Sequence, residues 1–190
     1  MSPLNEAGYF LFNVIFDLIT WLFLLRLLLQ LVRADFYNPL SQFIVKTTAP
    51  ILTPLRRLIP PVRQLDTASL VVLVLLGMAK FALTLYMANG ILGHPLGLLV
   101  LSLGNLLSVT LTFYVVLIFI LALLSWVAPY QHNPGISLLG QLTAPVLRPA
   151  QRIIPSLSGL DLSPLVTILA LQLLQILIAK PIMQIGQTML

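Results

Sequence analysis

The sequence predicts an all-α integral membrane protein with four transmembrane helices, built from two tandem parallel repeats. Three observations lead to this prediction: the composition of the chain, the length of its apolar runs and an internal repeat. Of its 190 residues, 59% are hydrophobic and only 8% are charged, whereas soluble domains carry about 25% charged residues. The chain therefore has too few charged side chains to cover a water-facing surface.

Four apolar segments are long enough to be membrane spans. A hydrocarbon core of about 30 Å requires roughly 20 helical residues, and a helix satisfies its own backbone hydrogen bonds in lipid. The predicted spans cover residues 8–32, 67–89, 106–128 and 162–179. Between the second and third spans, glycines and a proline interrupt the apolar run. Residues 90–105 fit either an interfacial hairpin or an early, kinked start of the third helix near Leu96.

The chain repeats itself at an offset of 95 residues. Without any gap, residues 38–71 match residues 133–166 at 14 of 34 positions. Seven of these matches are Asn, Pro, Arg or Asp, which the abundance of leucine cannot produce by chance. We therefore predict two units. They are residues 1–95 and 96–190, each with two spans and an intervening proline-rich segment, at residues 38–61 and 133–156.

Each proline-rich segment carries the pattern A-P-x-L-x-P-x-x-R-x-I-P and is followed by Leu-Asp and an apolar span. This duplicated pattern resembles the YggT family, and its two-unit form resembles the proteobacterial members. The resemblance covers nearly the whole chain. It implies a bacterial inner-membrane protein with a role in osmotic or envelope stress or in cell division, and in plastid relatives cofactor assembly or nucleoid distribution. It implies no settled molecular activity.

The positions of the basic residues predict the orientation. Seven of the ten Lys and Arg residues lie in the two loops that contain the proline-rich segments. By the positive-inside rule, both segments should face the cytoplasm and both termini the periplasm. Because each unit has an even number of spans, the two units should share one orientation, with an axis along the membrane normal. This arrangement differs from that of an inverted-repeat transporter.

The proline-rich segments are expected to be amphipathic and to lie at the membrane interface. In the first, a short helix over residues 41–49 would be followed by a second helix that starts at Thr53-Pro54 and ends before Pro60-Pro61. The Asn-Pro pairs at residues 38–39 and 133–134 fit turn or helix-start residues. The apolar side would enter the headgroup boundary, and the arginines would meet anionic lipids.

Two functions of these segments are compatible with the sequence: membrane anchoring, and docking of a cytoplasmic or membrane protein partner. Nucleic acid is not expected, because the basic residues are few and lack interleaved aromatic residues. The candidate lipid or partner contacts are Pro50, Pro54, Arg56, Arg57, Pro60 and Asp66 in the first unit, and Pro145, Pro149, Arg152, Pro155 and Asp161 in the second.

Asp66 and Asp161 stand directly before the second and fourth spans. At a helix start, an acidic side chain can accept hydrogen bonds from free backbone N–H groups and interacts favourably with the helix dipole. Alternatively, these aspartates could pair with Arg57 and Arg152 and hold each loop against the next span.

Ionisable residues within the apolar spans are functional candidates by default. At about 1.5 Å per helical residue, Asp17 and Lys80 lie at matching depth in consecutive antiparallel helices, so we predict that they pair. The equivalent residues of the second unit, Thr112 and Gln175, would form a neutral pair. Such a pair is either a structural clamp or part of an ion or proton path. Arg26 should snorkel to the cytoplasmic side or reach a loop carboxylate.

The sequence contains no recognisable catalytic triad, paired carboxylates, nucleotide fingerprint or metal-ligand cluster, and it has only five acidic residues and no cysteine. We therefore expect neither an enzyme nor a cofactor. The favoured function is a non-enzymatic scaffold, assembly or stress-response factor that acts through the basic segments. The alternative is a small ion channel or transporter subunit. A homo-oligomer is compatible with either function.

Overall fold

The computed structural model describes residues 3–127, 133–153 and 161–190. Within these residues the regular elements are all helices, with an isolated β-bridge between Val62 and Leu65, so the predicted all-α class is confirmed. The helices are α1 (Pro3–Leu31), α2 (Pro39–Leu58), α3 (Thr67–Asn89), α4 (Pro95–Val127), α5 (Pro134–Ile153), α6 (Ser163–Leu174), the π-helical turn η1 (Gln175–Ala179) and α7 (Lys180–Thr188).

Four of the described helices are long and apolar enough to cross a membrane, which suggests a membrane protein. They are Pro3–Leu31, Thr67–Asn89, Pro95–Ser125 and Ser163–Thr188. The predicted second span has the bounds of α3. The other three helices extend beyond their predicted spans, most of all α4, which begins at Pro95. The division into units 1–95 and 96–190 stays a prediction.

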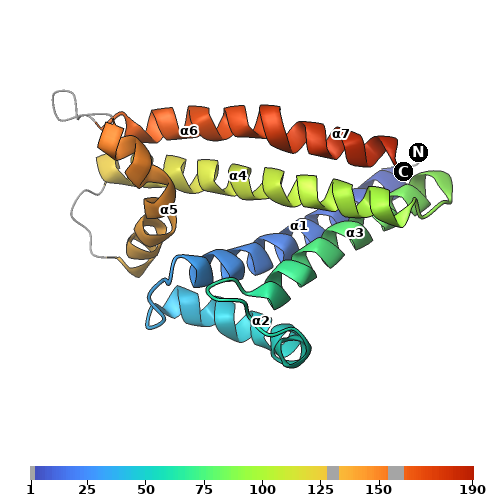
Figure 1. Cartoon of the computed structure of the whole chain (residues 1–190), viewed down its shortest axis with the longest axis horizontal. Coiled ribbons are helices and arrows are strands. Elements are labelled where there is room, and N and C mark those ends of the chain that lie inside the picture. The colour runs from blue at the N-terminus through green and yellow to red at the C-terminus, as the bar shows by residue number, and fades with distance from the viewer. Residues whose placement is uncertain (1–2, 128–132, 154–160) are drawn as a thin grey trace.

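The helices form two antiparallel pairs (Figure 1). One pair consists of α4 and the continuous α6–η1–α7 helix, and the other consists of α1 and α3. The second pair crosses the first obliquely, and α3 packs against α4. Both chain termini lie at one end of the molecule, and α2 and α5 lie toward the other end. The buried core joins the pairs, since Phe23 and Leu24 of α1 share one cluster with Phe113 and Leu117 of α4.

Glycines allow α4 and α7 to pack closely. A Cβ atom on Gly186 would lie 2.5 Å from the backbone nitrogen of Leu101, and one on Gly104 would lie 2.9 Å from that of Met183. Small residues permit such approaches between helices in membranes. Residues 95–105 belong to α4, so they do not form the interfacial hairpin that the sequence also allowed. Some of the glycines that interrupt its apolar pattern mark the contact with α7.

The fourth span contains a π-helical turn, η1, directly before Lys180-Pro181. A proline inside an α-helix removes one backbone hydrogen bond, and its ring collides with the carbonyl group four residues earlier, here that of Leu177. A π-turn is wider than an α-turn and relieves this collision. The helix therefore continues to Thr188, beyond the predicted end of the span at residue 179.

Each proline-rich segment forms one helix rather than the two short helices predicted for the first. The bounds of α2 and α5 are 95 residues apart, and each helix contains two internal prolines. Asn38 caps α2, because its side chain accepts a hydrogen bond from the backbone N–H of Leu40 at 2.9 Å. The predicted start at Thr53 was wrong. The predicted stop was right, since the helix ends at Ile59 in extended geometry before Pro60.

The helix continues through its prolines because one face is fixed by packing. Ser41, Ile44, Thr48 and Leu52 are buried at helical spacing, whereas Pro50 and Pro54 are exposed. Each proline costs a backbone hydrogen bond, while burial of the opposite face stabilises the helical path. In α5, Thr143 and Leu147 are buried at the corresponding positions.

Candidate functional site

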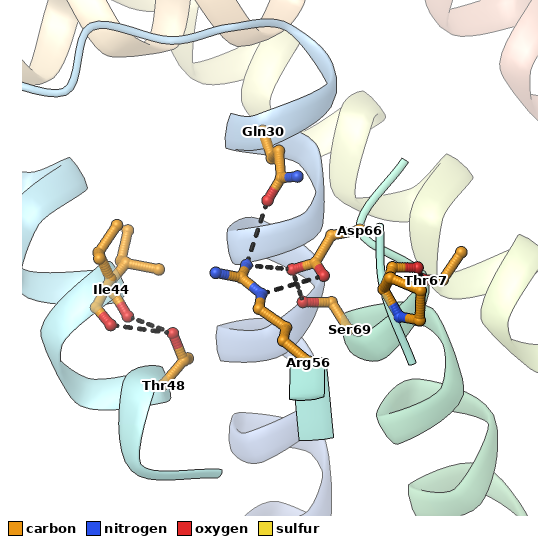
Figure 2. A network of polar contacts seen from close by, with 9 residues as sticks. Gln30, Ile44, Thr48, Arg56, Asp66, Thr67 and Ser69 are labelled. Carbon is orange, nitrogen blue, oxygen red and sulfur yellow. Dashed lines mark hydrogen bonds and ion pairs between the residues drawn. The ribbon is translucent and has the colours of Figure 1, made fainter. Parts of the chain in front are cut away.

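A network of polar contacts joins α1, α2 and α3 at the end of the molecule away from the termini (Figure 2). Arg56, near the end of α2, donates from Nε to Asp66 Oδ1 at 3.3 Å and from Nη2 to Gln30 Oε1 of α1 at 3.2 Å. Its Nη2 also forms an ion pair of 2.5 Å with Asp66 Oδ2. The Oγ of Ser69, in the first turn of α3, donates to Asp66 Oδ2. The network therefore ties three helices together.

The Asp66 side chain is completely buried, whereas that of Arg56 is 33% exposed. Burial raises the pKa of the Asp66 carboxyl, but the hydrogen bonds from Arg56 and Ser69 and the positive charge of Arg56 outweigh it and hold that pKa below its usual value. Asp66 consequently remains ionised at neutral pH, immediately before the first residue of α3.

Two sequence-based expectations about this loop were wrong. Asp66 makes no side-chain capping hydrogen bond to α3; its oxygens accept from Arg56 and from the Ser69 hydroxyl instead. Its cationic partner is Arg56 rather than Arg57. Successive residues of a helix point about 100° apart, and Arg56 lies four residues after Leu52 on the packed side of α2 while Arg57 is exposed.

In the second half of the chain, a neutral glutamine replaces the arginine that contacts the aspartate. Asp161 accepts a hydrogen bond from the backbone N–H of Ser163 at 2.8 Å, as a helix-start aspartate was expected to do. Its other oxygen accepts from Gln151 Nε2 at 3.3 Å. Gln151 occupies the position of Arg56 at the 95-residue offset, and the predicted partner Arg152 is exposed. Hydrogen bonding from Ser163 lowers the pKa of Asp161 against a smaller opposing effect of burial.

The prolines of the motif lie on the outside of their helices. Pro50 and Pro54 of α2 and Pro145 and Pro149 of α5 are exposed. The carbonyl group of Pro60 accepts a hydrogen bond of 2.7 Å from Thr67 Oγ1, which fixes the turn into α3. Pro155 lies outside the described residues.

The ion pair predicted within the first two spans is present. Lys80 Nζ of α3 lies 2.6 Å from Asp17 Oδ1 of α1. The Lys80 side chain is 16% exposed and that of Asp17 is 52% exposed. For the second half of the chain, the prediction named Gln175 correctly but gave it the wrong partner, Thr112. Gln175 donates to Ser108 Oγ, one helical turn before Thr112, at 3.1 Å.

Comparison with known proteins decides the family. The family model described as CCB3/YggT matches this chain twice, at residues 6–87 and 100–182. The chain belongs to the CCB3/YggT family. It is 44% identical over 179 residues to an uncharacterized protein of Pseudomonas aeruginosa, covering 94% of this chain and 91% of that protein. It is 37% identical over 187 residues to the uncharacterized protein YggT of Escherichia coli K12, covering 95% and 94% of the two chains. No solved structure matches it.

The residue ranges matched by the CCB3/YggT model include the polar contacts at the ends of both proline-rich helices. The first includes Arg56 and Asp66, and the second includes Gln151 and Asp161. Neither relative is named for an enzymatic activity. Within the described residues, no three His, Cys, Asp or Glu side chains are grouped in a way that could hold a metal ion.

A further contact in this CCB3/YggT chain joins the proline-rich helices to each other. Asn38 Nδ2 donates to the backbone carbonyl oxygen of Pro134 at 2.7 Å, and the backbone N–H of Asp35 donates to Gln141 Oε1 at 2.8 Å. Asn38 is 6% exposed. Asn133 caps its own helix by accepting from the backbone N–H of Gly135 at 2.8 Å, and its side chain makes no other hydrogen bond to residues that the structure describes.

Sequence reasoning missed several partners in these contacts. Gln30 carried a usable signal, because it lies one helical turn after Arg26 and therefore on the same side of α1. Ser69 stands three residues after Asp66, the distance at which a side chain can reach back to a helix start. The approach of Asn38 to Pro134 had no local signal, since it depends on how the two halves pack.

Proposed function

We propose that this CCB3/YggT protein is a non-enzymatic scaffold or assembly factor of the bacterial inner membrane. In this proposal, α2 and α5 lie at the cytoplasmic surface as amphipathic helices and present a basic, partly apolar platform to a protein partner. The observation that carries the proposal is the exposed side of α2, where apolar and basic side chains form two neighbouring edges.

The apolar edge of α2 is formed by Leu40, Phe43, Ile51 and Leu58, and the basic edge by Lys46 and Arg57. Phe43 is 64% exposed and Leu58 is 81% exposed. The packed side of the helix lies opposite the basic edge and beside the apolar edge, whose side chains remain exposed in the single chain. A helix with apolar and basic edges side by side suits the boundary between lipid headgroups and water.

The exposed end of α5 carries a second set of basic and apolar side chains. Arg148, Arg152 and Ile153 are exposed, the last to 80%. Because Asn38 connects the start of α2 to the start of α5, a partner could contact both helices together. Clustered arginines on such a surface favour an acidic partner segment.

A crosslinking experiment tests the scaffold proposal. A photoreactive amino acid at Thr53, which is exposed on α2, should capture a defined partner in cells. Replacing Arg57, Arg148 and Arg152 together with glutamine should abolish that capture, because the partner would lose its cationic contacts. Lys180→Gln removes an exposed charge from α7 and serves as the control. Unchanged capture by the triple variant would refute the proposal.

A small ion channel or transporter subunit is a second candidate, favoured by the Asp17–Lys80 pair. Charged groups inside membrane spans commonly mark ion or proton paths, and the Asp17 side chain is half exposed. If the protein conducts ions, Asp17→Asn should change the flux into liposomes while the protein still inserts. No flux of the wild-type protein under any ion gradient would remove this candidate.

A further inference from the structure

Arg26 of α1 is a half-buried cation without a hydrogen-bonding partner in the described part of the chain. Its Nε atom is buried and unpaired there, and neither of the two ion pairs found among these residues includes it. A guanidinium group carries five N–H donors and keeps its positive charge in proteins. Arg26 therefore requires an acceptor, preferably an anionic one.

The neighbouring network does not supply that acceptor. Arg26 interacts electrostatically with Arg56 and Asp66. Both oxygens of Asp66 already accept from Arg56, and the side-chain oxygen of Gln30 does so too. Figure 2 shows these acceptors directed at the Arg56 guanidinium. Two cations share one carboxylate, so one positive charge in this cluster is not neutralised.

The position of the cluster indicates which anion would be available. Arg26 precedes the end of α1 at Leu31 by about 7.5 Å, at 1.5 Å per helical residue. If the candidate spans α1 and α3 cross the bilayer, the site formed by Arg26, Arg56 and Asp66 lies near the end of both spans, at the level of the lipid headgroups. Arginine binds phosphate through paired N–H donors.

We infer that Arg26 and Arg56 together bind the phosphate of one anionic phospholipid beside the end of α1. The lipid neutralises the excess positive charge and gives Arg26 its acceptor. This inference does not rest on the proposed protein partner; it requires only that α1 and α3 cross the bilayer.

Comparison with the second half of the chain predicts how many lipids each chain binds and suggests a substitution for testing the site. At the 95-residue offset, Arg26 corresponds to Leu121 and Arg56 to Gln151. Since the second half has neither arginine, each chain should bind one lipid at such a site rather than two. Arg26→Leu introduces the residue that the second half tolerates at this position.

Native mass spectrometry of the detergent-purified chain, titrated with phosphatidylglycerol, tests the inference. The wild type should retain one lipid per chain, and Arg26→Leu should weaken retention at least tenfold. Lys180→Gln, which removes an exposed cation from α7, should retain the lipid as the wild type does. Arg26→Lys keeps the charge but loses the paired donors and should fall between wild type and Arg26→Leu. Wild-type retention by folded Arg26→Leu would overturn the inference.

Thermal unfolding separates the sources of phosphate. Phosphatidylglycerol should raise the Tm of the wild type but not that of Arg26→Leu, while phosphatidylcholine and inorganic phosphate should raise neither. Equal protection by inorganic phosphate would overturn the assignment to a lipid. No protection of the wild type by phosphatidylglycerol would overturn the site itself. Arg26→Leu should leave partner crosslinking through Thr53 unchanged, which separates this site from the proposed scaffold function.

Discussion

Asp66 keeps its negative charge in the protein interior because Arg56 and Ser69 donate hydrogen bonds to it. Removal of an ionised side chain from water is costly unless donors replace the lost hydration. At Asp161 the carboxylate is exposed and accepts from an amide and a backbone N–H. Replacement of the aspartate should therefore cost more stability at Asp66 than at Asp161.

Acid should destabilise the protein through Asp66. Its pKa is lower in the folded chain than the unfolded value of about 3.9. This contribution to stability is therefore complete above the unfolded pKa and is lost as the pH falls through the folded pKa. Asp66→Asn should lower the unfolding free energy at pH 7 by about 1–2 kcal/mol, because Arg56 is partly solvated.

Thermal unfolding in detergent between pH 7 and pH 3 measures this effect. The Asp66→Asn variant should lose less stability on acidification than the wild type does. Asp161→Asn, the matched change at an exposed position, should flatten the profile less. Parallel profiles for Asp66→Asn and the wild type would show that this carboxylate does not govern acid sensitivity.

The helices of this protein show how far local sequence rules extend. The existence of four candidate spans and the bounds of α3 followed from apolar length alone, and Asn38 and Pro60 marked the ends of α2. The internal prolines misled the prediction, because the packing of Thr48 and Leu52 against the core outweighs two lost backbone hydrogen bonds. Likewise, Gly104 weakens an isolated helix but permits close contact with α7, which only the tertiary structure reveals.

The contact between α4 and α7 should be sensitive to side-chain size. In Gly186→Leu, the new side chain would meet the backbone of Leu101, where even a Cβ atom would be 2.5 Å from the nitrogen. We expect a loss of about 1–3 kcal/mol, typical of overpacking. Gly140→Ala in α5 meets nothing within 4 Å and should be neutral or slightly stabilising. Thermal unfolding of both variants tests this, and equal stability would contradict it.

At the level of the whole molecule, α4 connects the two halves. It packs against α3 on one side and against α6 and α7 on the other, while Asn38 and Asp35 link the proline-rich helices. Local sequence could predict the motif residues of the candidate site but not these cross-contacts, since each joins a side chain to a backbone group about a hundred residues away. The predicted orientation depends on a different property, the distribution of Lys and Arg.

The orientation can be measured directly because the chain contains no cysteine. Single cysteines at Thr53 of α2 and Ser137 of α5, both exposed, should react with an impermeant maleimide only after the inner membrane is opened. A cysteine at Asn89, at the end of α3, should react in intact spheroplasts. Labelling of Thr53 and Ser137 from opposite sides of the membrane would show that the two halves do not share one orientation.

Because Asn38 is linked to Pro134, the two asparagines at the 95-residue offset should differ in how well they tolerate substitution. The acceptor is a main-chain oxygen, so exchange of the side chain at position 134 leaves it in place, whereas any residue without a donor at position 38 removes the link. Asn133 serves only its own helix and is easier to replace. Deep mutagenesis of the gene should therefore find position 38 intolerant and position 133 permissive, although both positions hold asparagine at the 95-residue offset.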